Sequence, residues 1–274
     1  MNDEFKMFWG VASGSSVKAM KQLEVKNIMI NFSTYHNEPW FGIENLFVDS
    51  GGYSFLKNKK EYQTTKRQYI SYIYSYSPDF FALRDYPCEP DLLSELNRSV
   101  KEHQDMTIKE HRELIDLYES WGKTINSKPV SVLQGYDINQ YLDHYDRLKE
   151  EGLLTDILAI GSICARNNLD QIRRIVVKLR QEIPNRIRLH GFGIKIKSFQ
   201  KHPKILKCLD SADTNAYDPG GKSVPKMSSH RISGGEKKTW WDPAFQMLKM
   251  QRDINRLKNL DDGQSRMFEY DMEE

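Results

Sequence analysis

The sequence predicts an α/β fold, a single-domain (β/α)8 barrel, and three observations support this prediction. Short apolar runs rich in β-branched and aromatic residues recur about eight times, the number of strands that such a barrel contains. Helix-like segments separate these runs, and strands that alternate with helices pair in parallel. The chain has 274 residues, close to the roughly 250 that one barrel takes. An open, doubly wound sheet is the rival architecture, but no GxGxxG motif follows the first run.

Each expected strand is a short run of apolar residues with high β-propensity. In chain order, the expected strands cover residues 8–11, 27–30, 46–48, 80–83, 130–133, 157–160, 187–192 and 208–212.

The expected helices show apolar residues at helical spacing or a capping residue at the start. They cover residues 16–23, 64–76, 107–121, 138–150, 169–182, 198–207 and 243–260. The third is predicted to begin at Thr107, because Thr107 and Glu110 have the spacing of a capping box. We expect residues 1–260 to form the barrel domain and residues 261–274 an acidic C-terminal tail.

Composition excludes several classes of protein. Hydrophobic residues make up 39% and charged residues 28% of the chain, which is typical of a globular protein rather than a disordered one. No run approaches the roughly 18 apolar residues of a membrane span, and the N-terminus lacks a signal-peptide pattern. We therefore expect a cytoplasmic protein. The three cysteines form no CxxC or CxC pair and no HExxH is present, so we expect neither a metal nor a cofactor.

Positive charge is concentrated in one part of a chain whose net charge is only +2. Residues 166–207 contain twelve lysines and arginines against two acidic residues. Such a segment is typical of a surface that binds a polyanion, although a solvated helix face would look the same. The side chains that we expect to contact a nucleic-acid backbone are Arg166, Lys195, Lys197, Lys222, Lys226 and Arg231.

Polar residues follow most of the expected strands, at the end where a barrel of this type carries its chemistry. Taken singly, each group is more often an ordinary turn. Together they bring three carboxylates, a carboxamide and several glycines around one opening. Carboxylate and carboxamide side chains can hydrogen-bond to the edge of a base, and a further carboxylate can attack an electron-poor sugar carbon. The glycines are expected to let a flat ligand approach the backbone.

The order of these motifs resembles the tRNA-guanine transglycosylase superfamily. Val48–Tyr53 is similar to its DSGG(F/Y) signature, and Asp85 falls at its second aspartate. Residues 132–135 resemble its VQG motif, and residues 158–162 resemble its glycine-rich strand end. Residues 211–217 resemble the corresponding segment of the DpdA-type, DNA-acting branch.

The resemblance implies a TIM barrel that cleaves the N-glycosidic bond of a base in a polynucleotide. Asp213 would be the nucleophile that attacks C1′, with Asp210 as the alternative because the local alignment can slip by three residues. Asp49 would be the acid–base group. The residues implied in the base pocket are Ser50, Gly51, Gly52, Tyr53, Asp85, Gln134, Gly135, Gly161, Ser162 and Asn215.

Departures from the superfamily favour DNA over RNA as the partner. The tRNA-modifying members carry a CxCxxC zinc site after the barrel, and this chain has none. The base is then either a product, if water leaves an abasic site, or a co-substrate, if a free base is exchanged in. Three alternatives stay open: a non-catalytic nucleic-acid-binding or partner subunit, an RNA enzyme, and a barrel acting on a small sugar or nucleoside. Residues 220–238 are either a phosphate-binding loop or a plain surface loop, and Trp240 and Trp241 either core anchors or wedges in DNA.

Overall fold

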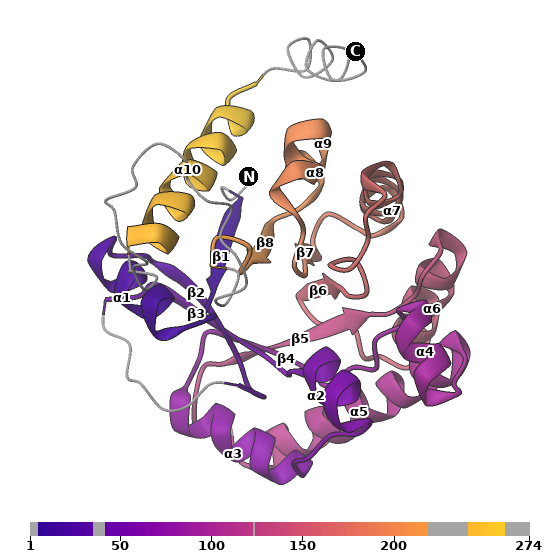
Figure 1. The fold of residues 1–274 in the computed structure, drawn as a ribbon. Helices are drawn as coiled ribbons and strands as arrows, with labels where there is room; N and C mark the ends of the chain where they lie inside the picture. Colours follow the sequence, from indigo (N-terminus) through magenta and orange to yellow (C-terminus); the bar gives the residue numbers. More distant parts are fainter. Residues whose placement is uncertain (1–4, 35–41, 123, 219–240, 261–274) are drawn as a thin grey trace.

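The computed structural model describes residues 5–34, 42–122, 124–218 and 241–260. Its strands form a closed barrel in the order β1 to β8, with β8 paired back to β1 and every neighbouring pair parallel (Figure 1). The predicted (β/α)8 barrel is confirmed.

The strands agree with the expected runs to within about three residues. They are β1 Lys6–Gly10, β2 Asn27–Asn31, β3 Asn45–Asp49, β4 Phe80–Ala82, β5 Lys128–Leu133, β6 Ile157–Ile160, β7 Arg188–Gly191 and β8 Ser211–Thr214.

Helices surround the barrel, and α10 closes the ring beside α1 and β1 (Figure 1). They are α1 Gly14–Gln22, α2 Gly52–Lys59, α3 Lys66–Tyr76, α4 Pro90–Leu96, α5 Val100–Ser120, α6 Ile138–Glu150, α7 Leu169–Glu182, α8 Ile196–Lys201, α9 Lys204–Cys208 and α10 Trp241–Lys258. No helix in the described ranges is both long enough and apolar enough to cross a membrane.

Apolar side chains fill the inside of the barrel. The inner cluster consists of Phe8, Met29, Phe47, Ala82, Val130, Val132, Ile157 and Ala159, with Phe80 and Phe192 packed against it. Phe8 and Phe47 meet edge to face with ring centroids 5.6 Å apart. The barrel is therefore a packed core and not a pore, so a ligand reaches polar groups only from the end of the barrel.

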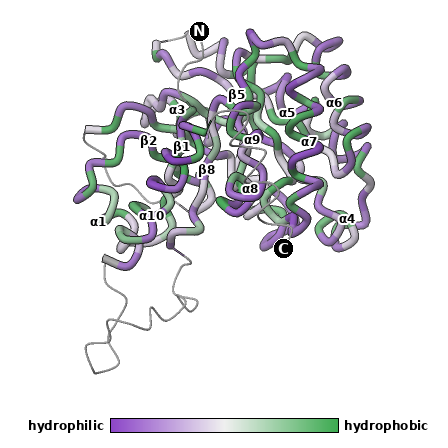
Figure 2. Tube along the Cα trace, turned by 90° about the horizontal axis from the view of Figure 1, so that it is seen from above, coloured by the Kyte–Doolittle hydropathy of each residue, from purple (hydrophilic) through white to green (hydrophobic). Residues whose placement is uncertain are grey.

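A second apolar layer lies between the strands and the helices. Hydrophobic and hydrophilic stretches alternate along α5, α6 and α7, as Figure 2 shows. In α7 the inward side chains Ile172, Val176 and Leu179 are completely buried. Burying a side chain of this size contributes about 1.5–3 kcal/mol, so the amphipathic pattern of the sequence holds each helix against the sheet.

Two helix predictions are wrong in their bounds. Helix α5 begins at Val100, because Ser99 and Glu102 form the capping box. Thr107 lies inside that helix, where its hydroxyl donates to the carbonyl of His103 at 2.8 Å. The segment predicted as one helix over 198–207 is two helices, interrupted at Pro203, which has no N–H for a continuous helix.

Candidate active site

The carboxyl ends of all eight strands meet at one end of the barrel, which we call the mouth. Asp49 is the last residue of β3 and Asp213 lies in β8, one residue before its end. Asp85 follows β4 by three residues, and Gln134 and Gly161 directly follow β5 and β6. Parallel strands thus bring the predicted polar residues to one place.

Asp49 is held by groups from β2 and from its own turn. Asn31, its register partner on β2, donates from Nδ2 to Oδ2 at 2.6 Å. The Gly51 N–H donates to Oδ1 at 3.2 Å. The pKa of Asp49 is raised to about 6: burial is the main cause, the Gly51 hydrogen bond lowers the pKa, and the negative charge of Asp213 raises it. This carboxyl can therefore carry a proton near neutral pH, and it lies within electrostatic reach of Asp213.

Asp85 belongs to a buried hydrogen-bond network across the mouth. The Ser50 hydroxyl donates to its Oδ1 at 3.1 Å, and the Gln134 amide donates to its Oδ2. The pKa of Asp85 is raised to about 7, mainly by burial and secondly by the charge of Asp49. Asp85 is the second carboxyl at the mouth that can hold a proton near neutrality.

The network continues from Gln134 to Glu89, a residue that the sequence did not single out. The Ser162 hydroxyl lies 2.6 Å from Gln134 Oε1 and 3.0 Å from Glu89 Oε2. The Ser162 hydroxyl thus has two acceptors within reach, and it accepts in turn from the Cys88 N–H at 2.6 Å. Burial raises the pKa of Glu89, and the Ser162 hydrogen bond acts in the opposite direction.

The glycines of the mouth make room for the protein's own polar groups. A Cβ on Gly161 would lie 2.3 Å from Gln134 Nε2, and one on Gly52 would lie 2.8 Å from the carbonyl oxygen of Asp85. Gly51 has φ +78°, and a Cβ on it would lie 2.8 Å from the Cβ of Ser33. A Cβ on Gly135 would lie 2.9 Å from the backbone nitrogen of Tyr141. These positions are therefore closed to larger residues by packing alone.

Other predicted pocket residues divide by exposure. Ser50 and Gln134 are completely buried, so they support Asp85 from behind. Tyr53, in the first turn of α2, is 40% exposed, and Asn215, directly after β8, is also exposed. The last two keep side-chain surface that can meet a ligand at the mouth.

Asp213 has two nitrogen neighbours on one side. Its Oδ1 accepts from the Gly193 N–H at 2.8 Å and lies 3.3 Å from Nε2 of His190. Among the described residues, Oδ2 has no hydrogen-bond partner. One oxygen is thus fixed and the other is left for chemistry.

The alternative nucleophile Asp210 lies at the wrong end of the barrel. The predicted strand 208–212 is displaced, because Cys208 ends α9 and β8 starts only at Ser211. The Asp210 carboxylate accepts from the Leu189 N–H at 2.7 Å. Three residues along a strand span roughly 10 Å, so Asp210 sits near the amino ends while Asp213 reaches the mouth.

The described residues that were predicted to contact the nucleic-acid backbone differ in burial. Arg166 is 4% exposed, and its guanidinium donates to the carbonyls of Ser162 and Tyr136 at 2.9 and 2.6 Å. It joins the loops after β5 and β6, so its prediction as a phosphate contact is wrong. Lys195 donates to the Arg166 carbonyl at 2.8 Å, whereas Lys197 in α8 is exposed.

Several sequence predictions fall outside the described residues. These are the contacts by Lys222, Lys226 and Arg231, the loop 220–238, Trp240 and the acidic tail 261–274.

Asn31, Glu89 and His190 are the residues that sequence reasoning missed. Asn31 follows the apolar run 27–30 as Asp49 follows 46–48, so the strand-end rule could have found it. His190 stands within an expected strand, where its inward direction was not evident. Glu89 lies seven residues beyond β4 and has no sequence signal of its own.

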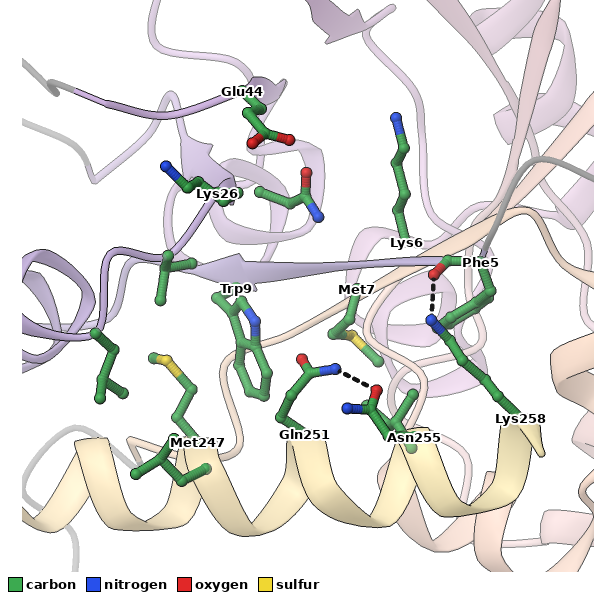
Figure 3. Close-up of a pocket in the computed structure, with 15 residues that line it drawn as sticks. Phe5, Lys6, Met7, Trp9, Lys26, Glu44, Met247, Gln251, Asn255 and Lys258 are labelled. Atoms are coloured by element: carbon green, nitrogen blue, oxygen red, sulfur yellow. Dashed lines mark hydrogen bonds between the residues drawn. The ribbon is translucent and has the colours of Figure 1, made fainter.

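A pocket of about 510 Å³ lies away from this site, between β1 and α10 near the amino ends (Figure 3). Trp9, Met7 and Met247 contribute to its wall, and Lys258 donates to the Phe5 carbonyl at 2.8 Å. The polar groups of the mouth, and not the size of a cavity, indicate that the mouth is the candidate active site. In the described ranges, no group of three or more His, Cys, Asp or Glu side chains is placed to hold a metal ion.

Comparison with known proteins identifies one family. A family model described as DpdA, DeoxyPurine in DNA protein A, matches residues 38–240. That range includes every strand end from β3 to β8, and it covers most of the chain. No curated protein matches the sequence.

Proposed function

The chain belongs to the DpdA family, a DNA-acting family of the tRNA-guanine transglycosylase type, and on that premise we propose that it cleaves the N-glycosidic bond of a base in DNA. Asp213 is the nucleophile and Asp49 the acid–base group. The supporting observation is this pair of neighbouring carboxylates on β3 and β8. One can carry a proton, and the other has one oxygen bonded to the Gly193 N–H and close to His190 Nε2.

In the first step, Asp213 Oδ2 attacks C1′ of the deoxyribose. The bond between C1′ and the base nitrogen breaks, and its electron pair leaves with the base. Asp49 gives its proton to the leaving base, because a group with a pKa near the working pH is an effective general acid. The product is a glycosyl ester on Asp213 and an ionised Asp49.

The second step reverses this chemistry with a new acceptor. The ring nitrogen of an incoming base attacks C1′, gives its proton to Asp49 and releases the Asp213 carboxylate. Water in the same position would leave an abasic site. The transglycosylase type of the family favours base exchange as the main outcome.

Base recognition is assigned to the buried network on the other side of the mouth. A base within a duplex must be flipped out of the stack to reach a barrel end. Asp85, supported by Ser50 and Gln134, faces the base edge, and the exposed Tyr53 ring stacks on it. Asn215 contacts the sugar side beside Asp213.

The test uses duplex and single-stranded DNA containing guanine or a 7-deazaguanine at one position, with and without free isotope-labelled 7-deazaguanine. Mass spectrometry measures released and incorporated base, and alkali cleavage measures abasic sites. Incorporation that depends on the free base supports exchange, and alkali-labile sites without it support hydrolysis. DNA binding with neither product would support the non-catalytic alternative and overturn this proposal.

A further inference from the structure

We propose that His190 is a positioning residue for Asp213, a neutral imidazole that donates from Nε2 and holds one carboxylate oxygen so that the other is directed at the sugar. The inference rests on the proposed role of Asp213 as nucleophile. The sequence analysis assigned no role to this histidine.

Strand pairing places the three residues in line. His190 on β7 is the register partner of Ser211 on β8. Residues two apart on a strand point to the same face, so Ser211 and Asp213 both direct their side chains into the barrel. The imidazole lies between them, with Nδ1 2.9 Å from Ser211 Oγ and Nε2 3.3 Å from Asp213 Oδ1.

The chemistry of the partners determines the tautomer. An ionised carboxylate only accepts, so Nε2 must carry the proton that faces Asp213. In a neutral ring Nδ1 is then an acceptor, and the Ser211 hydroxyl donates to it. Hydrogen bonds thus run in one direction, from Ser211 through His190 to Asp213.

Aromatic side chains enclose the ring. His190 is completely buried, with the rings of Phe47 and Phe192 at centroid distances of 4.9 Å and Phe8 at 6.0 Å. A buried imidazole whose two nitrogens both have partners is rigid, which suits a group that must hold another in place.

The resulting constraint is specific to one oxygen. The His190 and Gly193 N–H groups both point at Oδ1 of Asp213, so the carboxylate cannot rotate without losing two donors. The arrangement is not a hydrolytic Ser-His-Asp triad, because Ser211 lies beneath the imidazole on the side away from the mouth. Serine here orients the histidine, and the carboxylate reacts.

The first test is spectroscopic and needs no substrate. In protein labelled with ¹⁵N-histidine, the proposal predicts a protonated Nε2 and an unprotonated Nδ1 for His190 at pH 7.5. The His190→Gln variant assigns these signals by their loss, and Asp213→Asn should shift them. A proton on Nδ1, a doubly protonated ring, or signals unmoved in Asp213→Asn would overturn the proposal while leaving base release by Asp213 intact.

The second test separates positioning from folding. His190→Met keeps the volume without a donor and should lower kcat about 10- to 100-fold, the effect of one lost charge-assisted hydrogen bond. KM should change little, because the base network is untouched. His190→Gln keeps a donor near the Nε2 position and should restore most of kcat.

The matched control is His111→Met. His111 on α5 is completely buried, and neither ring nitrogen has a hydrogen-bond partner within the described part of the chain. This variant should retain the wild-type kcat. Equal losses of kcat in His111→Met and His190→Met, or no rescue by His190→Gln, would show that the role of His190 is only structural.

Discussion

Asp49 and Asp213 lie at one mouth, on β3 and β8, yet the protein holds them in different ways. Asp49 accepts from the Asn31 amide and a turn N–H, stands beside the Asp85 network, and has a pKa raised to about 6. Asp213 stands on an aromatic layer and accepts from the Gly193 N–H, with the His190 ring against the same oxygen. The β3–β5 side is suited to holding protons and the β7–β8 side to orienting a carboxylate, which is why we assign acid–base work to one and attack to the other.

The largest expected effect is that of Asp213→Asn. An amide is a far weaker nucleophile than a carboxylate, so turnover should fall by at least about 10³-fold while DNA binding is retained. Single-turnover base release and a binding assay on the same DNA measure the two quantities. Asp210→Asn is the control, because Asp210 lies at the other end of the barrel. Loss of activity in Asp210→Asn with activity kept in Asp213→Asn would reverse the assignment.

Asp49→Asn should remove the acid–base step and its pH dependence. Because the pKa of Asp49 is raised to about 6, its proton is present below that pH and is lost as pH rises through it. The wild-type rate of base departure should therefore decline above about pH 6. The variant should be about 10²-fold slower at pH 6 and insensitive to pH over this range. A variant that kept the wild-type pH profile would place the proton on another group.

Asp85→Asn tests the raised pKa of Asp85 through the pH dependence of folding stability. A carboxyl whose pKa is raised on folding favours the folded state below its unfolded value of 3.8, and this contribution is lost as pH rises towards about 7. Removing the carboxyl should therefore increase the free energy of unfolding by about 1–3 kcal/mol at pH 8. The gain should shrink towards pH 4. Denaturant unfolding at the two pH values measures it, and a gain independent of pH would argue against a raised pKa.

Gly161→Ala asks whether the glycines serve the network or the ligand. The added Cβ would lie 2.3 Å from Gln134 Nε2, and the buried Gln134 is bonded at both ends of its amide. The amide should shift and weaken its bond to Asp85, at a cost of about 1–3 kcal/mol in base capture or stability. The free-energy difference by which the protein discriminates between guanine and 7-deazaguanine DNA should fall by a similar amount. Wild-type discrimination and stability would show that Gln134 has room to move.

Lys197→Ala should have the smallest effect, confined to DNA affinity. Lys197 is exposed in α8, which follows β7 at the mouth. If it contacts one phosphate, its loss should reduce the log–log salt slope of binding by about 0.7–0.9 without changing base preference. Lys178→Ala is the control, since Lys178 pairs with Glu182 near the far end of α7. Equal slopes in the two variants would remove Lys197 from the DNA interface.

The barrel and most of its mouth could be predicted from the sequence because strand ends converge by topology. Once the apolar runs are taken as parallel strands, Asp49, Asp85 and Gln134 must lie at one end. The displaced β8 shows the limit of this reasoning. The apolar residues Cys208 and Leu209 are buried but precede β8, so the sequence pattern placed the strand three residues too early. With that shift, the pattern could not decide whether Asp210 or Asp213 lies at the mouth.

What the sequence could not predict depends on contacts between side chains far apart in the chain. Glu89 joins the site through Ser162, and His190 joins it through its register with Ser211 on β8, which the sequence does not specify. Arg166 was predicted to lie at the surface, but its guanidinium donates to carbonyls of two loops and is buried between them. A basic stretch of sequence does not show which of its arginine side chains are exposed.

The most direct measurement of the central claim is the site of the covalent intermediate. The enzyme is mixed with substrate DNA and no acceptor base, quenched with denaturant within one turnover, digested and analysed by mass spectrometry. The proposal predicts a deoxyribosyl ester on the peptide that contains Asp213, absent from Asp213→Asn and retained in Asp210→Asn. An ester on the peptide that contains Asp49 would contradict the division of roles between the two carboxylates.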